Sequence, residues 1–238
     1  MLAATTTTTA TSTTGGQNCL YFLCTQYRMH PALAALPNAL FYAGRLRDGV
    51  TRADRPPLVP HLPPLHVLDV RGSAVVDHTK STYNVLEART VMGVISDLVG
   101  SHGIAASRIG VVCFFRAHAI LVERLLKEAS CGGGPAVLDL QDVVVNTVDA
   151  FQGGERDVMI LTTAWTDVSS SRFVADPHRL CVALTRAKHH LIVVGGADVL
   201  QGTGIFAEIL RKARGTPGGY SRSFPAAIVG SCGRGSGD

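Results

Sequence analysis

Short apolar segments alternate with amphipathic ones through the middle of the chain. Five runs have the length and composition of buried strands, at residues 65–70, 109–115, 142–148, 157–164 and 190–196. Between them, residues 84–100 and 117–129 repeat apolar side chains at helical spacing. A shorter helix is predicted after Asp176, because Pro177 suits a first helical position.

Strands that alternate with helices form parallel sheets that are covered on both faces. The sequence therefore predicts an α/β fold with one domain, a mostly parallel sheet and helices on both faces. We expect this domain at residues 19–212. Residues 1–18 are expected to be a disordered Thr-rich tail, and residues 213–238 a disordered basic Gly/Ser-rich tail.

Composition narrows the class of protein without naming a function. The chain is 46% hydrophobic and 17% charged, which is typical of a protein that folds around a core. It has no run of eighteen apolar residues, so no membrane partner is expected. From Arg211 onward, five basic residues stand against Asp238 alone, which accounts for the whole net charge of +4. The basic charge is therefore a weak sign of nucleic-acid binding.

The six cysteines are scattered and include no C-x-x-C pair. This usage favours free thiols in a reducing compartment over disulfides or zinc. No Cys/His cluster has the spacing of metal ligands, so no metal site is predicted. We expect an intracellular protein, in the nucleus or the cytoplasm.

Three stretches carry unusual polar chemistry: "QYRMHP" (26–31), "NTVDAFQGGERDV" (146–158) and "VALTRAK" (182–188). Each has an ordinary explanation when taken singly. Arg28 could pair with any acid, Tyr27 could be a core residue, and Arg186 could stabilise a helix C-terminus. The second stretch follows a predicted strand. Because parallel sheets bind ligands beyond the carboxyl ends of their strands, we expect this polar turn to lie at that edge.

Taken together and in this order, the stretches resemble the second RecA-like domain of superfamily-1B helicases. The resemblance is to the DNA2/NAM7-like branch, which contains the nonsense-mediated-decay helicase and senataxin. It spans about residues 20–200 and is carried by four motifs: "QYRMHP", "NVLEA" (84–88), "TVDAFQGGERDV" (147–158) and "CVALTRAK" (181–188).

The resemblance implies half of an ATP site. In this family ATP lies between two RecA-like domains, and arginines reach the γ-phosphate across the cleft. Arg28 and Arg186 match those two catalytic arginines. Tyr27 matches a residue that packs on the adenine, and Glu155 matches one near the ribose. Gln26 belongs to the same nucleotide-binding motif as Tyr27.

The same resemblance implies a single-strand contact. Thr147 matches a hydroxyl that touches the backbone of single-stranded RNA or DNA. Gln152 and Gly153 would couple the nucleotide to the nucleic acid, as part of the nucleotide-binding set. Asp149 is expected to hold the turn through backbone amides.

Two other residues that match the family pattern can be explained equally well without the resemblance. Asn84 can cap a helix, and Glu87 can be an exposed acid.

Some positions depart from the family pattern. "FFRAH" (114–118) stands where the family has P-Y-x-x-Q, so His118 replaces a glutamine. His178, Cys181 and Gly154 also differ from the usual arginine, asparagine and basic residue. These changes put some nucleic-acid and domain-closure contacts in doubt and leave Arg28, Glu155 and Arg186 intact.

The chain has no G-x-x-x-x-G-K-[ST] motif and no acidic pair that ends a strand. The phosphate loop and most of the Mg²⁺ ligands are therefore expected in a first RecA-like domain that is missing here, and that domain is an expected partner. The leading interpretation is the C-terminal half of an ATP-dependent RNA or DNA helicase. The alternatives are a non-enzymatic, solitary helicase-like module that binds nucleic acid or a protein, and an unrelated nucleotide-binding α/β domain.

Overall fold

A parallel sheet of six strands forms the centre of the molecule. The computed structural model describes residues 21–131, 138–151, 153–166 and 171–223. The strand order is β10-β3-β9-β8-β6-β7, and every neighbouring pair is parallel. The strands are β3 (Leu65–Asp69), β6 (Ile109–Cys113), β7 (Val144–Thr147), β8 (Arg156–Thr162), β9 (Ala187–Gly195) and β10 (Tyr220–Ser221).

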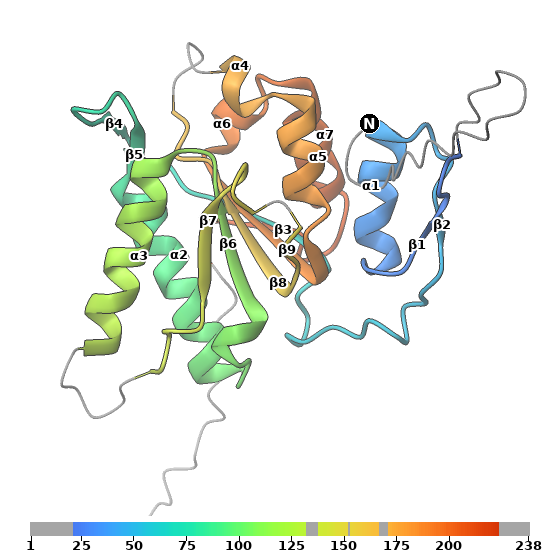
Figure 1. The fold of residues 1–238 in the computed structure, drawn as a ribbon, viewed down its shortest axis with the longest axis horizontal. Coiled ribbons are helices and arrows are strands. Elements are labelled where there is room, and N and C mark those ends of the chain that lie inside the picture. Colours follow the sequence, from blue (N-terminus) through green and yellow to red (C-terminus); the bar gives the residue numbers. More distant parts are fainter. Residues whose placement is uncertain (1–20, 132–137, 152, 167–170, 224–238) are drawn as a thin grey trace, which may run out of the picture.

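Helices cover both faces of the sheet, as Figure 1 shows. On one face lie α2 (Val85–Ser96) and α3 (Arg116–Cys131), and on the other lie α1 (Pro31–Phe41), α5 (Pro177–Leu184) and α7 (Gly204–Arg214). Short helices α4 (Ser171–Val174) and α6 (Ala197–Leu200) complete the second layer. A separate cluster of buried apolar residues fills each side. The predicted fold class is confirmed.

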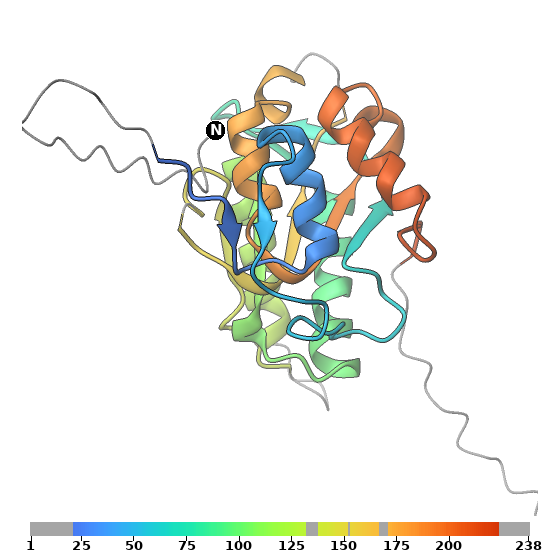
Figure 2. The ribbon, with the colours of Figure 1, turned by 90° about the vertical axis from the view of Figure 1, so that its right-hand side faces the viewer.

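Two small strand pairs lie outside the main sheet. β1 (Thr25–Gln26) pairs in parallel with β2 (Arg47–Asp48), and Figure 2 shows this pair beside α1. β4 (Ala74–Val76) and β5 (Thr82–Asn84) form an antiparallel hairpin near the start of α3.

The two predicted helix caps are confirmed. The Asn84 side chain accepts hydrogen bonds from the amides of Leu86 and Glu87 at the start of α2. Asp176 caps α5 in the same way, with Pro177 as its first helical residue. α2 ends at Ser96 and runs into a π-helical turn, Asp97–Ser101, where the sequence predicted one helix to Gly100.

The C-terminal boundary differs from the prediction. Residues 213–223 were expected in a disordered tail, but they complete α7, turn and add β10 to the edge of the sheet beside β3. The turn uses Gly218 at a φ of +71°, a conformation that glycine adopts without strain. The Tyr220 hydroxyl then donates to Asp69 at 2.8 Å. Gly218 thus allows a tight turn in a segment that was expected to be disordered. The other expected tail residues, 1–18 and 224–238, lie outside the described residues.

Within the described residues, no helix is both long enough and apolar enough to cross a membrane.

Candidate nucleotide and nucleic-acid site

The predicted site residues lie at two opposite edges of the sheet. Thr147 ends β7 and pairs with Cys113 at the carboxyl ends of the strands. Glu155 directly precedes β8, whose first residue, Arg156, pairs with Ala187 at the amino ends. Parallel strands need a crossover between them, and residues 148–155 supply it, with Val148 and Phe151 packed in the core. The prediction that the whole polar turn lies at the carboxyl edge is therefore wrong for Glu155.

At the amino edge, Glu155 lies between two cations from distant segments. Its carboxylate pairs with the Arg28 Nε and, at 2.9 Å, with the Lys188 Nζ. Burial alone would raise the pKa of Glu155, but the hydrogen bonds and charges of Lys188 and Arg28 outweigh it and hold the pKa below its usual value. Glu155 is therefore ionised at neutral pH. Lys188 was not predicted, although it adjoins the "VALTRA" motif.

The Gln26 amide shapes the turn that presents Arg28. Its Oε1 accepts from the amides of Arg28 (3.0 Å) and Met29 (2.8 Å), and its Nε2 donates to the Met29 carbonyl and to Asp48. The side chain of Gln26 thus positions the backbone of this motif. Arg28 itself also donates to the Thr185 carbonyl at 2.9 Å, which brings it to the end of α5.

Arg55 fastens the same turn from outside. Its guanidinium donates to the carbonyls of Arg28 (2.9 Å) and Tyr27 (3.0 Å). The sequence gave no signal for this role, because Arg55 stands in a proline-rich connector without a motif.

The Tyr27 ring lies against Gly49 on one side and is otherwise largely exposed. It packs against Gly49, where a Cβ atom would overlap the ring, yet the residue is 66% exposed. An exposed ring on a firm support is suited to stacking against another flat group.

Arg186 is almost fully buried, at 4% exposure. Its guanidinium donates to the Val182 carbonyl (2.9 Å), the Gly154 carbonyl (3.2 Å) and the Thr185 hydroxyl (3.3 Å), which are all neutral groups. Burial lowers the pKa of Arg186, and the nearby positive charge of Arg28 lowers it further. Two guanidinium groups thus lie close together beside the single carboxylate of Glu155.

The local geometry of the crossover explains why positions 153 and 154 are both glycine. Gly153 adopts a φ of +86°, which favours glycine, and a Cβ on Gly154 would lie 2.8 Å from the Phe151 ring. The Gly154 carbonyl also accepts from Arg186. Gln152 lies outside the described residues, so its predicted role stays a prediction.

At the carboxyl edge, Thr147 is half-buried, and within the described residues its hydroxyl has one hydrogen bond, a long one of 3.4 Å from the Ala150 amide. Among the described residues, no backbone amide donates to Asp149, which was predicted to hold the turn in that way. It accepts instead from the Arg179 side chain at 3.0 Å. The Arg179 guanidinium in turn covers the Phe173 ring, which stacks with Phe115 at 5.3 Å.

Glu87 is fully buried, so its prediction as an exposed acid is wrong. Its Oε2 accepts from the Thr162 hydroxyl and from the amides of Thr163 and Ala164, and its Oε1 accepts from Asn84. Burial raises the pKa of Glu87 to about 7, although these four donors oppose the rise. The carboxylate fastens the start of α2 to the end of β8.

His118 completes this buried network. Its Nδ1 accepts from the Asn84 amide at 3.3 Å, so the proton is on Nε2, which donates to the Thr162 hydroxyl at 2.9 Å. Burial lowers the pKa of His118 to about 4. A glutamine, the residue of the family pattern at this position, can also donate and accept, so the histidine keeps both hydrogen-bonding capacities.

The parallel six-stranded sheet with helices on both faces is the architecture of a RecA-like α/β domain. Over residues 5–198 the chain matches the AAA domain family, and it belongs to that family. Its motifs and relatives place it among the DNA2/NAM7-like helicases of superfamily 1B, as their C-terminal RecA-like domain.

Three relatives illustrate this membership. The chain is 34% identical over 201 residues to "5'-3' DNA helicase ZGRF1" of Mus musculus, covering 84% of this chain and 10% of the relative. It is 31% identical over 204 residues to "Helicase sen1" of Schizosaccharomyces pombe (83% and 12%). It is 30% identical over 203 residues to "Regulator of nonsense transcripts 1" of Caenorhabditis elegans (79% and 18%). The chain thus spans between 10% and 18% of the length of these relatives.

Proposed function

We propose that this chain supplies one wall of an ATP-hydrolysis site in an RNA or DNA helicase, and that a first RecA-like domain supplies the other wall. The observation that carries the proposal is the pair of arginines, Arg28 and Arg186, which come from segments far apart in the chain and both lie beside Thr185. Together the two arginines carry more positive charge than the Glu155 carboxylate can balance. A triphosphate would supply the missing negative charge.

In the family that the motifs resemble, two arginines at these positions reach the γ-phosphate. Arg186 is held in place by three neutral acceptors and forms no ion pair with a described residue, although only 4% of it is exposed. Arg28 is held through Glu155 and the Thr185 carbonyl. Pre-oriented cations of this kind stabilise the charge that develops in phosphoryl transfer. Bidentate guanidinium groups match phosphate oxygens better than ammonium does.

The remaining residues of the cluster fit the rest of a nucleotide. Tyr27 offers an open ring for the base, and Glu155 is an ionised carboxylate that can accept ribose hydroxyls. Glu155 is engaged with two cations, so it is a poor ligand for a metal. Mg²⁺, which would shield the phosphate charge, would therefore be held by the first RecA-like domain.

We infer that single-stranded RNA or DNA runs along the opposite, carboxyl edge of the sheet. Thr147 lies there with a hydroxyl that is free to donate, because its one described hydrogen bond is as an acceptor. A hydroxyl contacts the phosphate backbone without reading sequence. The nucleotide and the strand would then occupy separate edges, joined by the crossover at residues 148–155.

A fusion experiment tests this function. The chain is fused behind the first RecA-like domain of a relative, and ATP hydrolysis is measured with and without single-stranded RNA. We expect Arg28→Ala to lower kcat by about a hundredfold or more, since an arginine at the γ-phosphate contributes on that scale. Arg89→Ala, an exposed arginine on α2, is the matched control. Equal rates for the two variants would overturn the proposal.

A further inference from the structure

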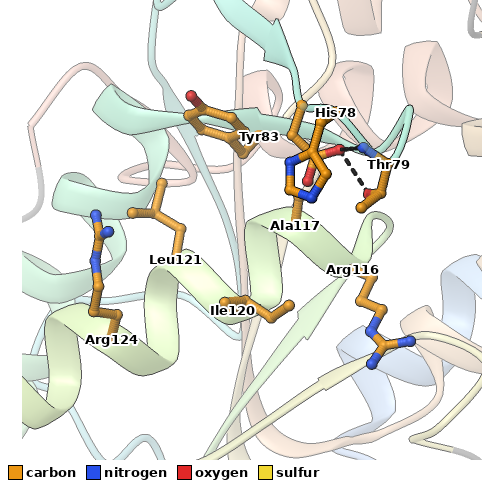
Figure 3. Close-up of a pocket in the computed structure, with 9 residues that line it drawn as sticks. His78, Thr79, Tyr83, Arg116, Ala117, Ile120, Leu121 and Arg124 are labelled. Carbon is orange, nitrogen blue, oxygen red and sulfur yellow. Dashed lines mark hydrogen bonds between the residues drawn. The ribbon is translucent and has the colours of Figure 1, made fainter.

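A groove between the β4–β5 hairpin and α3 belongs to neither set of predicted residues. It has a volume of about 620 Å³ and is lined by residues 77–79 and 83 of the hairpin and by one face of α3. Figure 3 shows the hairpin side chains facing this helix across the groove. We refer to it as the α3 groove. We propose that the α3 groove binds single-stranded nucleic acid, holding its phosphates with Arg116 and Arg124 and a base with Tyr83. The inference rests on the proposed strand path along the carboxyl edge and extends it.

The first argument is the spacing of charge along α3. Arg116, Ile120 and Arg124 are four residues apart in turn, so they share one face of the helix. A rise of 1.5 Å per residue separates the two arginines by about 12 Å along the axis. Figure 3 shows them at the two ends of the groove with Ile120 between them. Two cations at such a separation can each meet a different phosphate of one strand.

Both arginines are available for a ligand. Arg116 and Arg124 are exposed. Arg124 has a 3.5 Å contact with Glu128, but both side chains are more than 60% exposed. Such exposed pairs contribute little to stability, and a phosphate can replace the carboxylate.

The Asp77 carboxylate in the groove stays ionised and offsets part of this charge, but its Oδ1 is engaged by the hairpin turn. Asp77 Oδ1 accepts from the Thr79 amide (2.8 Å), the Thr79 hydroxyl (2.6 Å) and the Ser81 amide (2.9 Å). These hydrogen bonds lower the pKa of Asp77 and close the hairpin turn. The exposed side chains of His78 and Lys80 lie on the same hairpin turn, and Lys80 adds positive charge.

The second argument is the apolar floor between the charges. Ile120 is 54% exposed, which is unusual for a large apolar side chain in the middle of a helix. On the hairpin side of the helix, Tyr83 stands over Leu121 (Figure 3). Aromatic and apolar surface flanked by basic groups suits single strands, because bases stack while phosphates pair with the cations.

The third argument is position. Arg116 begins α3 three residues after Cys113, the residue that pairs with Thr147 at the carboxyl end of the sheet. The groove therefore continues from the edge where Thr147 lies. It is remote from the arginine–glutamate cluster at the amino edge, so a strand in it leaves the proposed ATP site free.

The test is a binding titration of the 238-residue chain with labelled oligouridine, read by fluorescence anisotropy over a range of salt. Strands of about five and about fifteen nucleotides bracket the site sizes of single-strand binders. We expect the double variant Arg116→Ala/Arg124→Ala to weaken the longer strand about tenfold or more. Its slope of log affinity against log salt should fall by roughly one to two, one unit for each lost phosphate contact.

Other variants separate the groove from the Thr147 contact. Tyr83→Leu keeps apolar volume but removes the ring, and it should weaken the longer strand about fivefold or more, the scale of one stacking contact. Thr147→Ala should weaken both strands. Arg89→Ala and Arg211→Ala remove exposed charge elsewhere and should change neither, and circular dichroism confirms that each variant is folded.

The outcomes distinguish the two proposals. If the double variant binds the longer strand with the affinity and salt slope of Arg89→Ala, the groove proposal is overturned. If the double variant weakens binding while Thr147→Ala does not, the groove stands and the Thr147 contact is wrong. A wild-type chain that binds neither strand contradicts both.

Discussion

Arg28 and Glu155 form an ion pair although 127 positions separate them in the chain. The pair joins the "QYRMHP" segment to the crossover that leads into β8. Lys188 of β9 completes it from a third segment. The three motifs that stand apart in the sequence are thus one cluster in space, at the amino edge of the sheet.

Glu155→Gln should reduce stability only slightly. The side chains of Arg28, Glu155 and Lys188 are each about a third exposed, so we expect a loss of about 1 kcal/mol in the free energy of unfolding. The folded-state pKa of Glu155 is depressed, so its contribution exists above the unfolded pKa of about 4.3 and is lost as pH falls through the folded value. Urea unfolding of the wild type and of Glu155→Gln at pH 7 and pH 3 measures this contribution to the free energy of unfolding. A loss at pH 7 above about 3 kcal/mol would show that the cluster is structural.

Arg186→Lys should destabilise the fold more than Arg28→Lys. Arg186 is buried and holds the Val182 and Gly154 carbonyls, and an ammonium cannot reach all of its acceptors. We expect a loss of about 2 kcal/mol, against less than about 1 kcal/mol for Arg28→Lys. Thermal unfolding of both variants makes the comparison. If the two melt together, the account of Arg186 is wrong. Arg28 variants are accordingly the cleaner probes of catalysis.

Glu87→Ala should be among the most damaging single changes. It leaves the Thr163 and Ala164 amides and the Thr162 hydroxyl without their acceptor, and we expect a loss of about 3 kcal/mol or more. The folded pKa of Glu87 is raised to about 7, so its effect runs opposite to that of Glu155. Between about pH 4.3 and 7 the folded state binds the extra proton, so this residue lowers stability as pH rises. Glu87→Gln, which cannot ionise, should remove that part of the pH dependence in urea titrations. An unchanged pH profile in this variant would contradict the assignment.

Two buried histidines should destabilise the fold in acid. His118 accepts a hydrogen bond from the Asn84 amide, and His190 accepts one from the Leu58 amide. Protonation of either ring would turn the accepting nitrogen into a donor that faces the amide N–H. Burial lowers both pKa values to about 4, below the unfolded value of 6.5. Stability is therefore lost as pH falls from about 6.5 to 4, by about 3 kcal/mol for each histidine. His118→Gln keeps a donor and an acceptor and should flatten this loss by about half, measured as unfolding midpoints from pH 7 to 4. A midpoint that falls as steeply as in the wild type would show that His118 does not titrate as described.

Local signals predicted much of the fold. The strand runs, the Asn84 and Asp176 caps and the helix at Pro177 each depend on a few neighbouring residues, and the structure confirms them. β10 was missed because Tyr220 and Ser221 form a strand only through pairing with β3, which a glycine-rich stretch does not reveal. The burial of Glu87 was missed for a related reason. Its donors, Thr162 to Ala164, come from a strand more than seventy positions away.

The candidate site was predictable in composition but not in layout. The motifs named Arg28, Glu155 and Arg186, and the structure brings them together. Their edge of the sheet was not predictable, because the crossover at residues 148–155 looks like a simple turn in the sequence. Lys188 and Arg55 contribute through contacts with distant backbone and side chains. Such contacts leave no local sequence pattern, and Arg55 in particular lies in no motif.

The central claim is that this chain holds half of an ATP site. The most direct test is ATP hydrolysis by the 238-residue chain alone, at saturating Mg²⁺ and single-stranded RNA. Our account predicts no turnover above a protein-free blank, because no residue described here can cradle the phosphates from the second side. Robust turnover by the purified chain that Arg28→Ala abolishes would contradict it.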